Sequence, residues 1–236
     1  MCGICGIISS EISEVVDKEL LTCMNRTLAH RGPDDEGYYL GTQAGLAMRR
    51  LSIIDLYTGQ QPISNETGDI WVVYNGEIYN YRQVRAALEQ KGHVFKTQSD
   101  TEIIVHAYEE YGEACVQYFN GMFALAVWDA RHRRLLLARD RLGIKPLLYW
   151  ADHRKLIFGS ELKAVIAHPD VPRQIDLVAL DHFLSLEYIP GPRTIFQDVH
   201  KLPPGHTLIF EQGKLKISQY WDVPYSPVEE DEKACI

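Results

Sequence analysis

The segment MFALAVWDARHRRLLLARD, residues 122–140, restricts the fold more than any other part of the chain, because two apolar runs flank a basic turn. Every position from Met122 to Trp128 is apolar, with no alternation between an apolar and a polar face. A run of this kind is typical of a strand that is covered on both faces. The cluster Arg131-His132-Arg133-Arg134 between the runs indicates the solvated tip of a hairpin. We therefore expect sheets that pack against each other.

Helical patterns are interspersed among further strands. Apolar residues recur at helical spacing in residues 17–29, 81–92, 101–112 and 176–186, and glycines at 92 and 112 stop two of these helices. Strands are predicted at residues 2–8, 37–41, 45–50, 70–74, 207–211 and 215–219, the last two joined by a turn at Gln212-Gly213. Since most of these strands are joined by hairpins, the pattern favours an α+β fold with largely antiparallel sheets and helices outside them.

Composition excludes several classes of function. The formal charge of −8 argues against a surface that binds nucleic acid or an anionic membrane. No apolar run approaches the ~20 residues that a transmembrane helix needs, and the start does not resemble a signal peptide. The 5 cysteines are odd in number and scattered, which is typical of the reducing cytoplasm. We expect one domain over residues 1–225, with its core at about 2–200, and a frayed tail at 226–236.

The chain begins with MCGICGI, in which Cys2 and Cys5 form a Cys-x-x-Cys pair. In a strand these two side chains would point to opposite faces, and no second pair follows at zinc spacing, so a metal site is not expected. A redox pair is an alternative that would require the two sulfurs to lie within disulfide reach. Cys5 by itself is expected to be a small buried hydrophobic residue.

Cys2 differs from Cys5 because of its position in the chain. Initiator methionine is usually removed when the second residue is small, and removal of Met1 would leave Cys2 with a free α-amine. An α-amine has a reference pKa of about 7.7–8.0 and a thiol one of about 8.5. A single residue would then supply both a nucleophile and a base near neutral pH.

Six motifs in this order resemble a known family: MCGICGI at 1–7, HRGPD at 30–34, RLSIID at 50–55, YNGEIYN at 74–80, TQSDTE at 97–102 and RDRLGIKPLLY at 139–149. From Met1 to about Tyr225 the chain resembles the class II glutamine amidotransferases of the N-terminal-nucleophile hydrolases, and within that class the asparagine synthetase type. The resemblance implies a four-layer α/β/β/α sandwich of two mainly antiparallel sheets. It also implies hydrolysis of L-glutamine through a Cys2 thioester, with release of glutamate and ammonia.

The resemblance also assigns roles to single residues. The side-chain amide of Asn75 and the backbone N–H of Gly76 would stabilise the oxyanion of a tetrahedral intermediate. Arg50 would bind the α-carboxylate of glutamine, and Asp100 its α-ammonium. Further glutamine contacts would come from Glu77 and from the segment Arg50, Leu51, Ser52, Ile53 and Ile54. His30, Arg31 and Asp34 are expected to order their loop and not to be catalytic. The segment 139–149 is expected to be structural or to contact a partner domain.

Two of these assignments have alternatives in the residues themselves. Asn75-Gly76 is also the strongest two-residue signal for a hairpin turn, although no second strand is obvious after Glu77. The doublet Arg49-Arg50 leaves open which arginine faces the substrate, and only the match to the family motif selects Arg50.

The expected partner is an ammonia acceptor. The synthetase half of the family carries a Ser-Gly-Gly-x-Asp-Ser loop that grips ATP, and no such stretch occurs in this sequence. ATP and Mg²⁺ are therefore expected only in a synthetase domain, joined to this chain or supplied separately, and no cofactor is expected here. The resemblance is also compatible with a homodimer.

The alternative function is a non-catalytic amidotransferase-like module for docking or regulation, in which Cys2 would be blocked or mispositioned.

Overall fold

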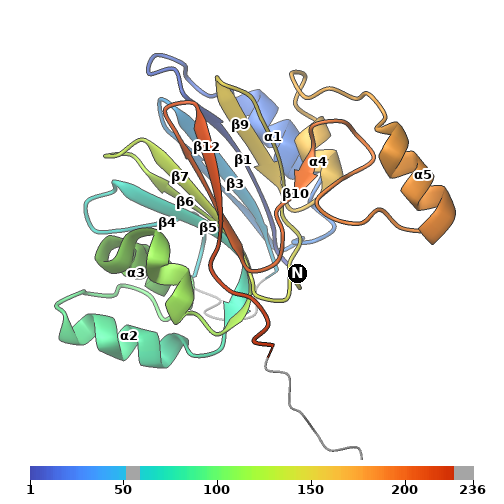
Figure 1. Cartoon of the computed structure of the whole chain (residues 1–236). Helices are drawn as coiled ribbons and strands as arrows, with labels where there is room; N and C mark the ends of the chain where they lie inside the picture. The colour runs from blue at the N-terminus through green and yellow to red at the C-terminus, as the bar shows by residue number, and fades with distance from the viewer. Residues whose placement is uncertain (52–58, 226–236) are drawn as a thin grey trace, which may run out of the picture.

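The computed structural model of the chain describes residues 1–51 and 59–225. In this part of the chain two six-stranded antiparallel sheets face each other (Figure 1). Sheet A has the order β10-β8-β9-β1-β3-β2, with β1 (Gly3–Ser9), β2 (Asp35–Leu40), β3 (Ala44–Arg50), β8 (Leu148–Ala151), β9 (Lys155–Gly159) and β10 (His200–Lys201). Sheet B has the order β12-β11-β7-β6-β5-β4, with β4 (Ile63–Ser64), β5 (Ile70–Ile78), β6 (Gly121–Asp129), β7 (Arg134–Arg139), β11 (His206–Glu211) and β12 (Lys214–Gln219).

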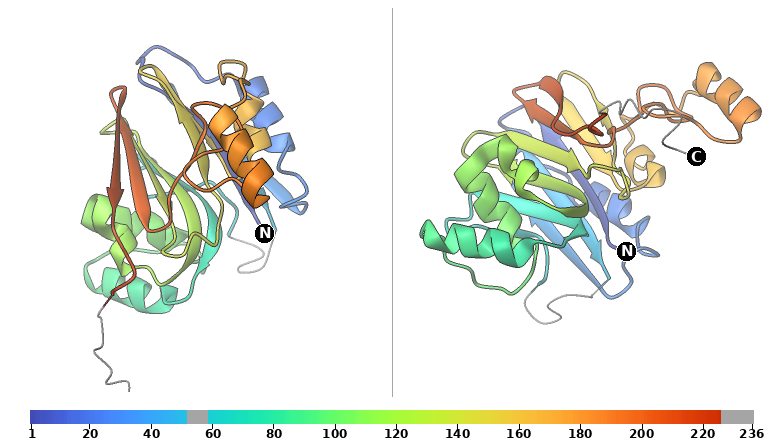
Figure 2. Two further views of the ribbon diagram at one scale, coloured as in Figure 1. Left: turned by 45° about the vertical axis from the view of Figure 1, so that its right-hand side comes forward. Right: turned by 60° about the horizontal axis from the view of Figure 1, so that its bottom comes forward.

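Helices cover the outer side of each sheet (Figure 2). Sheet A packs against α1 (Lys18–Arg26) and α4 (Leu162–Ile166). Sheet B packs against α2 (Tyr81–Gln90), α3 (Glu102–Tyr111) and the 3₁₀ helix η1 (Gly112–Tyr118). The helix α5 (Leu177–Leu186) stands apart from the two sheets. None of the helices in the described ranges has the length and apolar character needed to cross a lipid bilayer.

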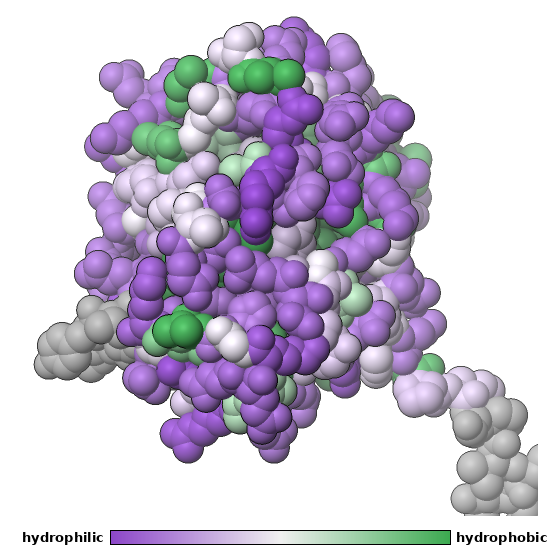
Figure 3. Space-filling model, turned by 90° about the vertical axis from the view of Figure 1, so that its left-hand side faces the viewer, coloured by the Kyte–Doolittle hydropathy of each residue, from purple (hydrophilic) through white to green (hydrophobic). Residues whose placement is uncertain are grey.

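Three layers of apolar side chains hold these elements together. In β6, Leu125 and Val127 pack under α2 and α3, whereas Ala126 and Trp128 pack between the sheets. Both faces of this strand are thus buried, which explains why its sequence is apolar at every position. The predicted four-layer α/β/β/α sandwich is confirmed. The outer side that carries α2 and α3 is mostly hydrophilic (Figure 3).

Local signals explain where elements begin and end. The side chain of Asp17 accepts a hydrogen bond from the backbone N–H of Glu19 at 2.8 Å and caps α1. Gly92 and Gly112 have φ of 98° and 58° just after α2 and α3, a conformation that favours glycine. Gln212 and Gly213 also have positive φ, as the two-residue turn between β11 and β12 requires. These predicted boundaries are confirmed.

The structure differs from the prediction most at β5. This strand does not end near residue 74 but pairs with β6 from Ile70 to Ile78. Asn75-Gly76 therefore lies inside a strand, and the hairpin-turn interpretation of this dipeptide is wrong. The short elements β8, β9 and α4 were not predicted. The expected frayed tail at 226–236 lies outside the described residues.

Candidate active site

A pocket opens where the N-terminus, the end of β3 and the middle of β5 meet. Its walls come from Met1 and Cys2, from Arg50 and Leu51, from residues 74–77 and from residues 99–101. Gly59, Gln61, Met122 and Lys145 complete the lining. The fold thus brings together four segments that are far apart in the sequence and that carry predicted motifs.

Cys2 lies directly before β1, with its side chain against the apolar layer between the sheets. The backbone N–H of Leu51 donates to its sulfur at 3.4 Å. Cys5 lies on the opposite face of β1, in the layer under α1, and burial raises the pKa of its thiol well above the ordinary value. The two cysteines are free thiols on different faces, so a shared metal ion and a redox pair are both excluded.

Arg31 holds the main chain of Cys2 in place. Its Nε donates to the carbonyl oxygen of Cys2 at 2.9 Å, and its Nη1 donates to Oε1 of Glu161 at 2.9 Å. Burial by itself raises the pKa of Glu161, but hydrogen bonds from Arg31, His30 and Lys163 lower this pKa to about 2. Glu161 therefore remains ionised and fixes the guanidinium. The HRGPD motif orders the residue predicted to be the nucleophile as well as its own loop.

Asn75 is a buried polar residue in the wall of the pocket. Its side chain is 1% exposed, and its Nδ2 has no hydrogen-bond partner among the residues that the structure describes. Strand alternation places this side chain on the face of β5 that Val73 also uses, between the two sheets. Cys2 packs against the same layer. A buried amide donor therefore lies in the pocket that holds the thiol.

Gly76 presents its backbone to the open edge of β5. Its neighbour Phe123 on β6 uses both its N–H and its carbonyl for hydrogen bonds with Asp140. Gly76 and Phe123 therefore form a non-hydrogen-bonded pair, in which backbone groups point away from each other. Two N–H groups on this edge are already bound, that of Tyr74 by Gln61 (2.7 Å) and that of Ile78 by Asp100 (3.1 Å). The N–H of Gly76 lies between them.

No side chain fits at position 76. A Cβ atom there would lie 2.3 Å from the carbonyl oxygen of Met122 and 2.7 Å from the Cα of Phe123. Both contacts are with the backbone of β6, which cannot shift because it is paired with β5 and β7. Glycine is therefore required by close approach of the two strands rather than by a turn.

Arg50 rather than Arg49 lines the pocket. Arg50 is the last residue of β3 and is 5% exposed. Arg49 points to the other face of the strand, where it forms an ion pair with Glu36 at 2.7 Å. The choice that the doublet left open is thus made by the register of β3. Ser52, Ile53 and Ile54, which were also predicted to contact glutamine, lie outside the described residues.

Asp100 lies in the pocket wall, just before α3, and is 5% exposed. One carboxylate oxygen accepts hydrogen bonds from the hydroxyl of Tyr74 (2.9 Å) and from the N–H of Ile78 (3.1 Å). Burial raises the pKa of Asp100, these two hydrogen bonds oppose the increase, and the nearby charge of Glu77 adds to it. The pocket thus has an acidic wall formed by Asp100 and Glu77, with the cation of Arg50 elsewhere in its lining.

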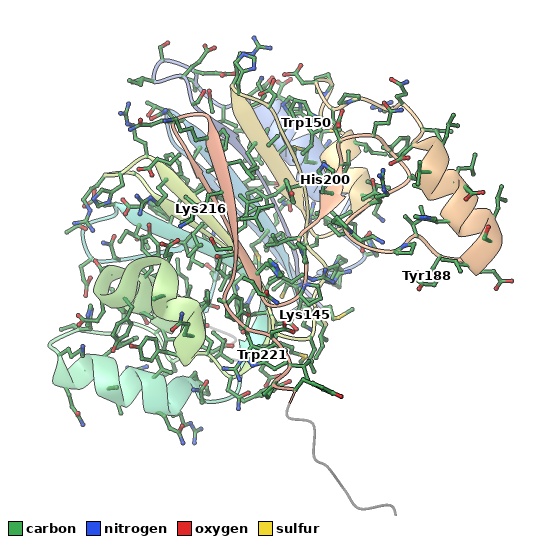
Figure 4. The ribbon with its side chains drawn as sticks, in the orientation of Figure 1. Lys145, Trp150, Tyr188, His200, Lys216 and Trp221 are labelled. Carbon is green, nitrogen blue, oxygen red and sulfur yellow. The ribbon has the colours of Figure 1, made fainter. Side chains whose placement is uncertain are left out.

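Gln61 and Lys145 are among the pocket residues that the sequence did not predict. Gln61 links β5 to α3, because its amide binds both Tyr74 and the hydroxyl of Thr101. Lys145 is buried and lies in the loop between β7 and β8 (Figure 4). This loop is ordered by Arg139, whose Nε donates to the Lys145 carbonyl at 2.8 Å, as expected for the 139–149 motif. Gln61 belongs to no local pattern that would signal a site, whereas Lys145 lies within the 139–149 motif, for which a structural or partner-contact role was predicted.

Among the residues that the structure describes, metal-ligating side chains do not converge in this pocket. In residues 1–51 and 59–225, the group of His, Cys, Asp or Glu side chains that has ligand spacing lies on α3 and in the loop before it. The arrangement around Cys2 offers instead a nucleophile, two candidate oxyanion donors and charges of both signs. These are the groups that acyl transfer from an amide requires.

Comparison with known proteins agrees with this chemistry. Residues 1–221 match the family of glutamine amidotransferase domains. The asparagine synthetases (glutamine-hydrolyzing) 3 and 2 of Bacillus subtilis (strain 168) are 39% and 42% identical over 94% of this chain, which covers 37% and 31% of their lengths. The chain therefore spans about a third of these relatives.

A solved structure, the allosteric regulatory enzyme of purine biosynthesis, shares the fold with a TM-score of 0.68 at 16% identity. The alignment covers 93% of this chain and 49% of that one. Since the family match runs through every described strand of both sheets, the chain belongs to the glutamine amidotransferase domain family.

Proposed function

We propose that this chain hydrolyses L-glutamine to glutamate and ammonia, with Cys2 as the nucleophile once Met1 has been removed. The observation that carries the proposal is the buried amide of Asn75, which lacks a partner among the described residues. An unpaired buried donor costs roughly 1–3 kcal/mol. The cost is offset when the donor serves a negative charge that develops during the reaction.

Charges in the pocket support recognition of a free amino acid. Arg50 binds the α-carboxylate through the planar fork of its guanidinium, and Asp100 binds the α-ammonium, with Glu77 beside it. Both ends of the backbone of glutamine are then fixed. The side-chain amide extends toward the thiol of Cys2.

The proposed reaction proceeds through two tetrahedral intermediates. The α-amine of Cys2 accepts the thiol proton, and the sulfur attacks Cδ of glutamine while the carbonyl electron pair moves to oxygen. This oxyanion is stabilised by Nδ2 of Asn75 and the N–H of Gly76. The oxyanion then collapses to a thioester and the C–N bond breaks, while the α-ammonium gives its proton to the leaving nitrogen, which departs as ammonia. Water, deprotonated by the same amine, then attacks the thioester and releases glutamate and the thiol.

The proposal extends to an acceptor for the ammonia. The two relatives are named as asparagine synthetases and are about three times as long as this chain. We propose an acceptor domain of the asparagine synthetase type, with ATP and Mg²⁺ used there. This acceptor domain is supplied either in the same polypeptide or as a separate chain. The protein could also form a homodimer, which analytical sedimentation would distinguish from a monomer. The free thiols of Cys2, Cys5, Cys23 and Cys115 support a location in the reducing cytoplasm.

An electrophilic chloroketone analogue of glutamine tests the proposal. We expect one equivalent to attach to Cys2 in protein whose N-terminal mass shows loss of Met1, and the same protein to release glutamate from glutamine. Cys2→Ala should abolish both, whereas Cys23→Ala, at an exposed thiol, should change neither. Labelling that persists in Cys2→Ala would refute the nucleophile. Absence of glutamate release from correctly processed protein would favour the non-catalytic module.

A further inference from the structure

Three potential metal ligands converge on the outer helical layer, away from the glutamine pocket. His93 follows α2, and its N–H donates to the Leu88 carbonyl at 3.1 Å, so the helix end fixes its position. His106 and Glu109 lie one turn apart on α3. Nδ1 of His93 is 3.2 Å from Nδ1 of His106, which is 3.2 Å from Oε2 of Glu109. The third side of this triangle, from His93 to Glu109, is 3.8 Å.

We propose that these three side chains bind one divalent transition-metal ion, and that Zn²⁺ fits the site best. Zinc lies about 2.0–2.2 Å from nitrogen and oxygen ligands, so tetrahedral geometry requires ligands separated by about 3.3–3.6 Å. The observed separations of 3.2, 3.2 and 3.8 Å lie around this range. Two imidazoles with one carboxylate are suited to zinc and related ions, whereas Ca²⁺ and Mg²⁺ prefer oxygen ligands.

Hydrogen bonding alone leaves the cluster poorly satisfied. If the contacts of His106 are hydrogen bonds, a single proton on its Nδ1 must serve both the Nδ1 of His93 and the carboxylate of Glu109. The lone pair of His93 would then face a negatively charged oxygen 3.8 Å away. A cation at the centre removes this conflict, because it accepts a lone pair from all three atoms.

Outer contacts resemble those that support metal sites. The second ring nitrogen of His106 lies 3.8 Å from Glu102, and that of His93 lies 3.6 Å from Glu110. Both distances exceed that of a hydrogen bond, and the carboxylates act on the two imidazoles through their negative charge. The remaining oxygen of Glu109 accepts a hydrogen bond from Asn65 at 2.8 Å. Of the three ligands, Glu109 is thus fixed by a hydrogen bond on its outer side, and the two imidazoles face nearby carboxylates.

Solvent can reach the site from one side. The side chain of His106 is 1% exposed, whereas those of His93 and Glu109 are 16% and 21% exposed. Figure 3 shows the mostly hydrophilic outer side on which α2 and α3 lie, and such surroundings are compatible with an ion and a water molecule as fourth ligand.

The site connects to the segment that carries Asp100. Glu102, behind His106, also accepts hydrogen bonds from the N–H groups of Lys96 (2.8 Å) and Thr97 (2.7 Å). A metal ion would thus link His93, at the start of the chain between α2 and α3, to His106 and Glu109 on α3, and so fix both ends of this connection. We assign the ion a structural role, which does not depend on the glutaminase proposal.

Metal titration of the untagged full chain, stripped with chelator, tests the site. A Cys2→Ala background prevents binding of the ion by an N-terminal cysteine. Co²⁺ should bind in one equivalent with the visible absorption of a tetrahedral nitrogen–oxygen site, and Zn²⁺ should displace it and raise the Tm. His93→Ala and Glu109→Gln should each weaken Zn²⁺ binding at least about 100-fold, since loss of outer partners alone costs roughly 10–100-fold.

His132→Ala is the matched control, because His132 lies beside Asp129 at the exposed tip of the β6–β7 hairpin. It should bind Zn²⁺ like the parent. Circular dichroism must show that each variant is folded. If His93→Ala does not fold, the Zn²⁺ affinity of Glu109→Gln alone tests the proposal. Absence of one-equivalent binding in the parent overturns the proposal. So does Zn²⁺ binding by folded His93→Ala or Glu109→Gln that is as tight as the parent's, or cobalt absorption of the sulfur-to-metal type.

Discussion

The Nε of Arg31 donates a hydrogen bond to the carbonyl oxygen of Cys2 at 2.9 Å, across 29 positions of sequence. Glu161, from the loop between β9 and α4, holds the other side of the guanidinium at 2.9 Å. The main chain of the proposed nucleophile is thereby linked to the segment after α1 and, through Arg31, to the start of α4. Arg31 acts through Cys2 and is a positioning residue.

Arg31→Met should lower kcat about 10–100-fold with little change in KM, because a hydrogen bond from a charged donor contributes roughly 1.5–3 kcal/mol. The rate at which iodoacetamide alkylates Cys2 should also change, which a purely structural role would not produce. Arg134→Met, which removes an ion pair with Glu211 between β7 and β11, is the control. An Arg31→Met enzyme with the parent's kcat and alkylation rate would contradict the assignment.

Retention of Met1 should abolish hydrolysis almost completely. Met1 lines the pocket, and while it is present the nitrogen of Cys2 is an amide that cannot act as a base. Intact mass and glutamate release should be measured on the same samples before and after aminopeptidase treatment. Full activity in a sample that keeps Met1 would rule out the mechanism.

Asn75→Ala should reduce turnover by about 10²–10³ with little effect on KM, because the amide is used mainly in the transition state. Asn75→Gly should be equally inactive, since Asn75 lies within β5 and not at a turn that glycine would suit. Asn25, a buried residue of α1, provides the control. Asn25→Ala should lower the Tm without a selective loss of kcat. A fully active Asn75→Gly would remove Asn75 from the mechanism.

Arg50→Lys should raise the KM for glutamine, because lysine cannot bind a carboxylate with two parallel hydrogen bonds. The adjacent Arg49→Lys is a matched control on the opposite face of β3, where its partner is Glu36. Steady-state kinetics of the two variants should therefore differ in KM and not in kcat. Equal KM values would place Arg50 outside the binding site.

Glutamine binding should weaken on acidification earlier than an ordinary aspartate would predict. Burial raises the pKa of Asp100, and only the ionised carboxylate attracts the α-ammonium. As pH falls through this raised pKa, Asp100 becomes neutral and kcat/KM should fall. The part of the acidic limb that Asp100 causes should be absent from Asp100→Asn, whose KM is high at every pH, and only the part caused by protonation of the Cys2 α-amine should remain. An identical limb in that variant would assign the titration to another group.

Much of the fold was predictable because its signals are local. The β6–β7 hairpin combines apolar runs with a basic turn, and α2 and α3 end at glycines with positive φ. The elements β8, β9 and α4 have only four or five residues each, too few for a periodic pattern. Their positions follow from packing in sheet A.

The site was predictable only in part, for a related reason. Cys2, Arg50, Asn75 and Asp100 were found through motifs that resemble a family, and the structure places all four in one pocket. Gln61 was not found, because its role depends on the three-dimensional fold: its side chain binds a backbone N–H at the edge of β5 where the described residues supply no pairing strand. The cluster of His93, His106 and Glu109 was missed because its first ligand is separated from the others by a loop and the start of a helix.

Among the described residues, side chains and not a strand close the edge of β5 beyond Val72. In the described part of the chain β4 pairs only with Trp71 and Val72, and beyond them Gln61 and Asp100 take the N–H groups of Tyr74 and Ile78. An uncovered edge would recruit strands from other molecules and promote aggregation. Substitutions of Gln61 or Asp100 should therefore reduce solubility as well as activity, and a bound substrate analogue should act as a protectant against precipitation.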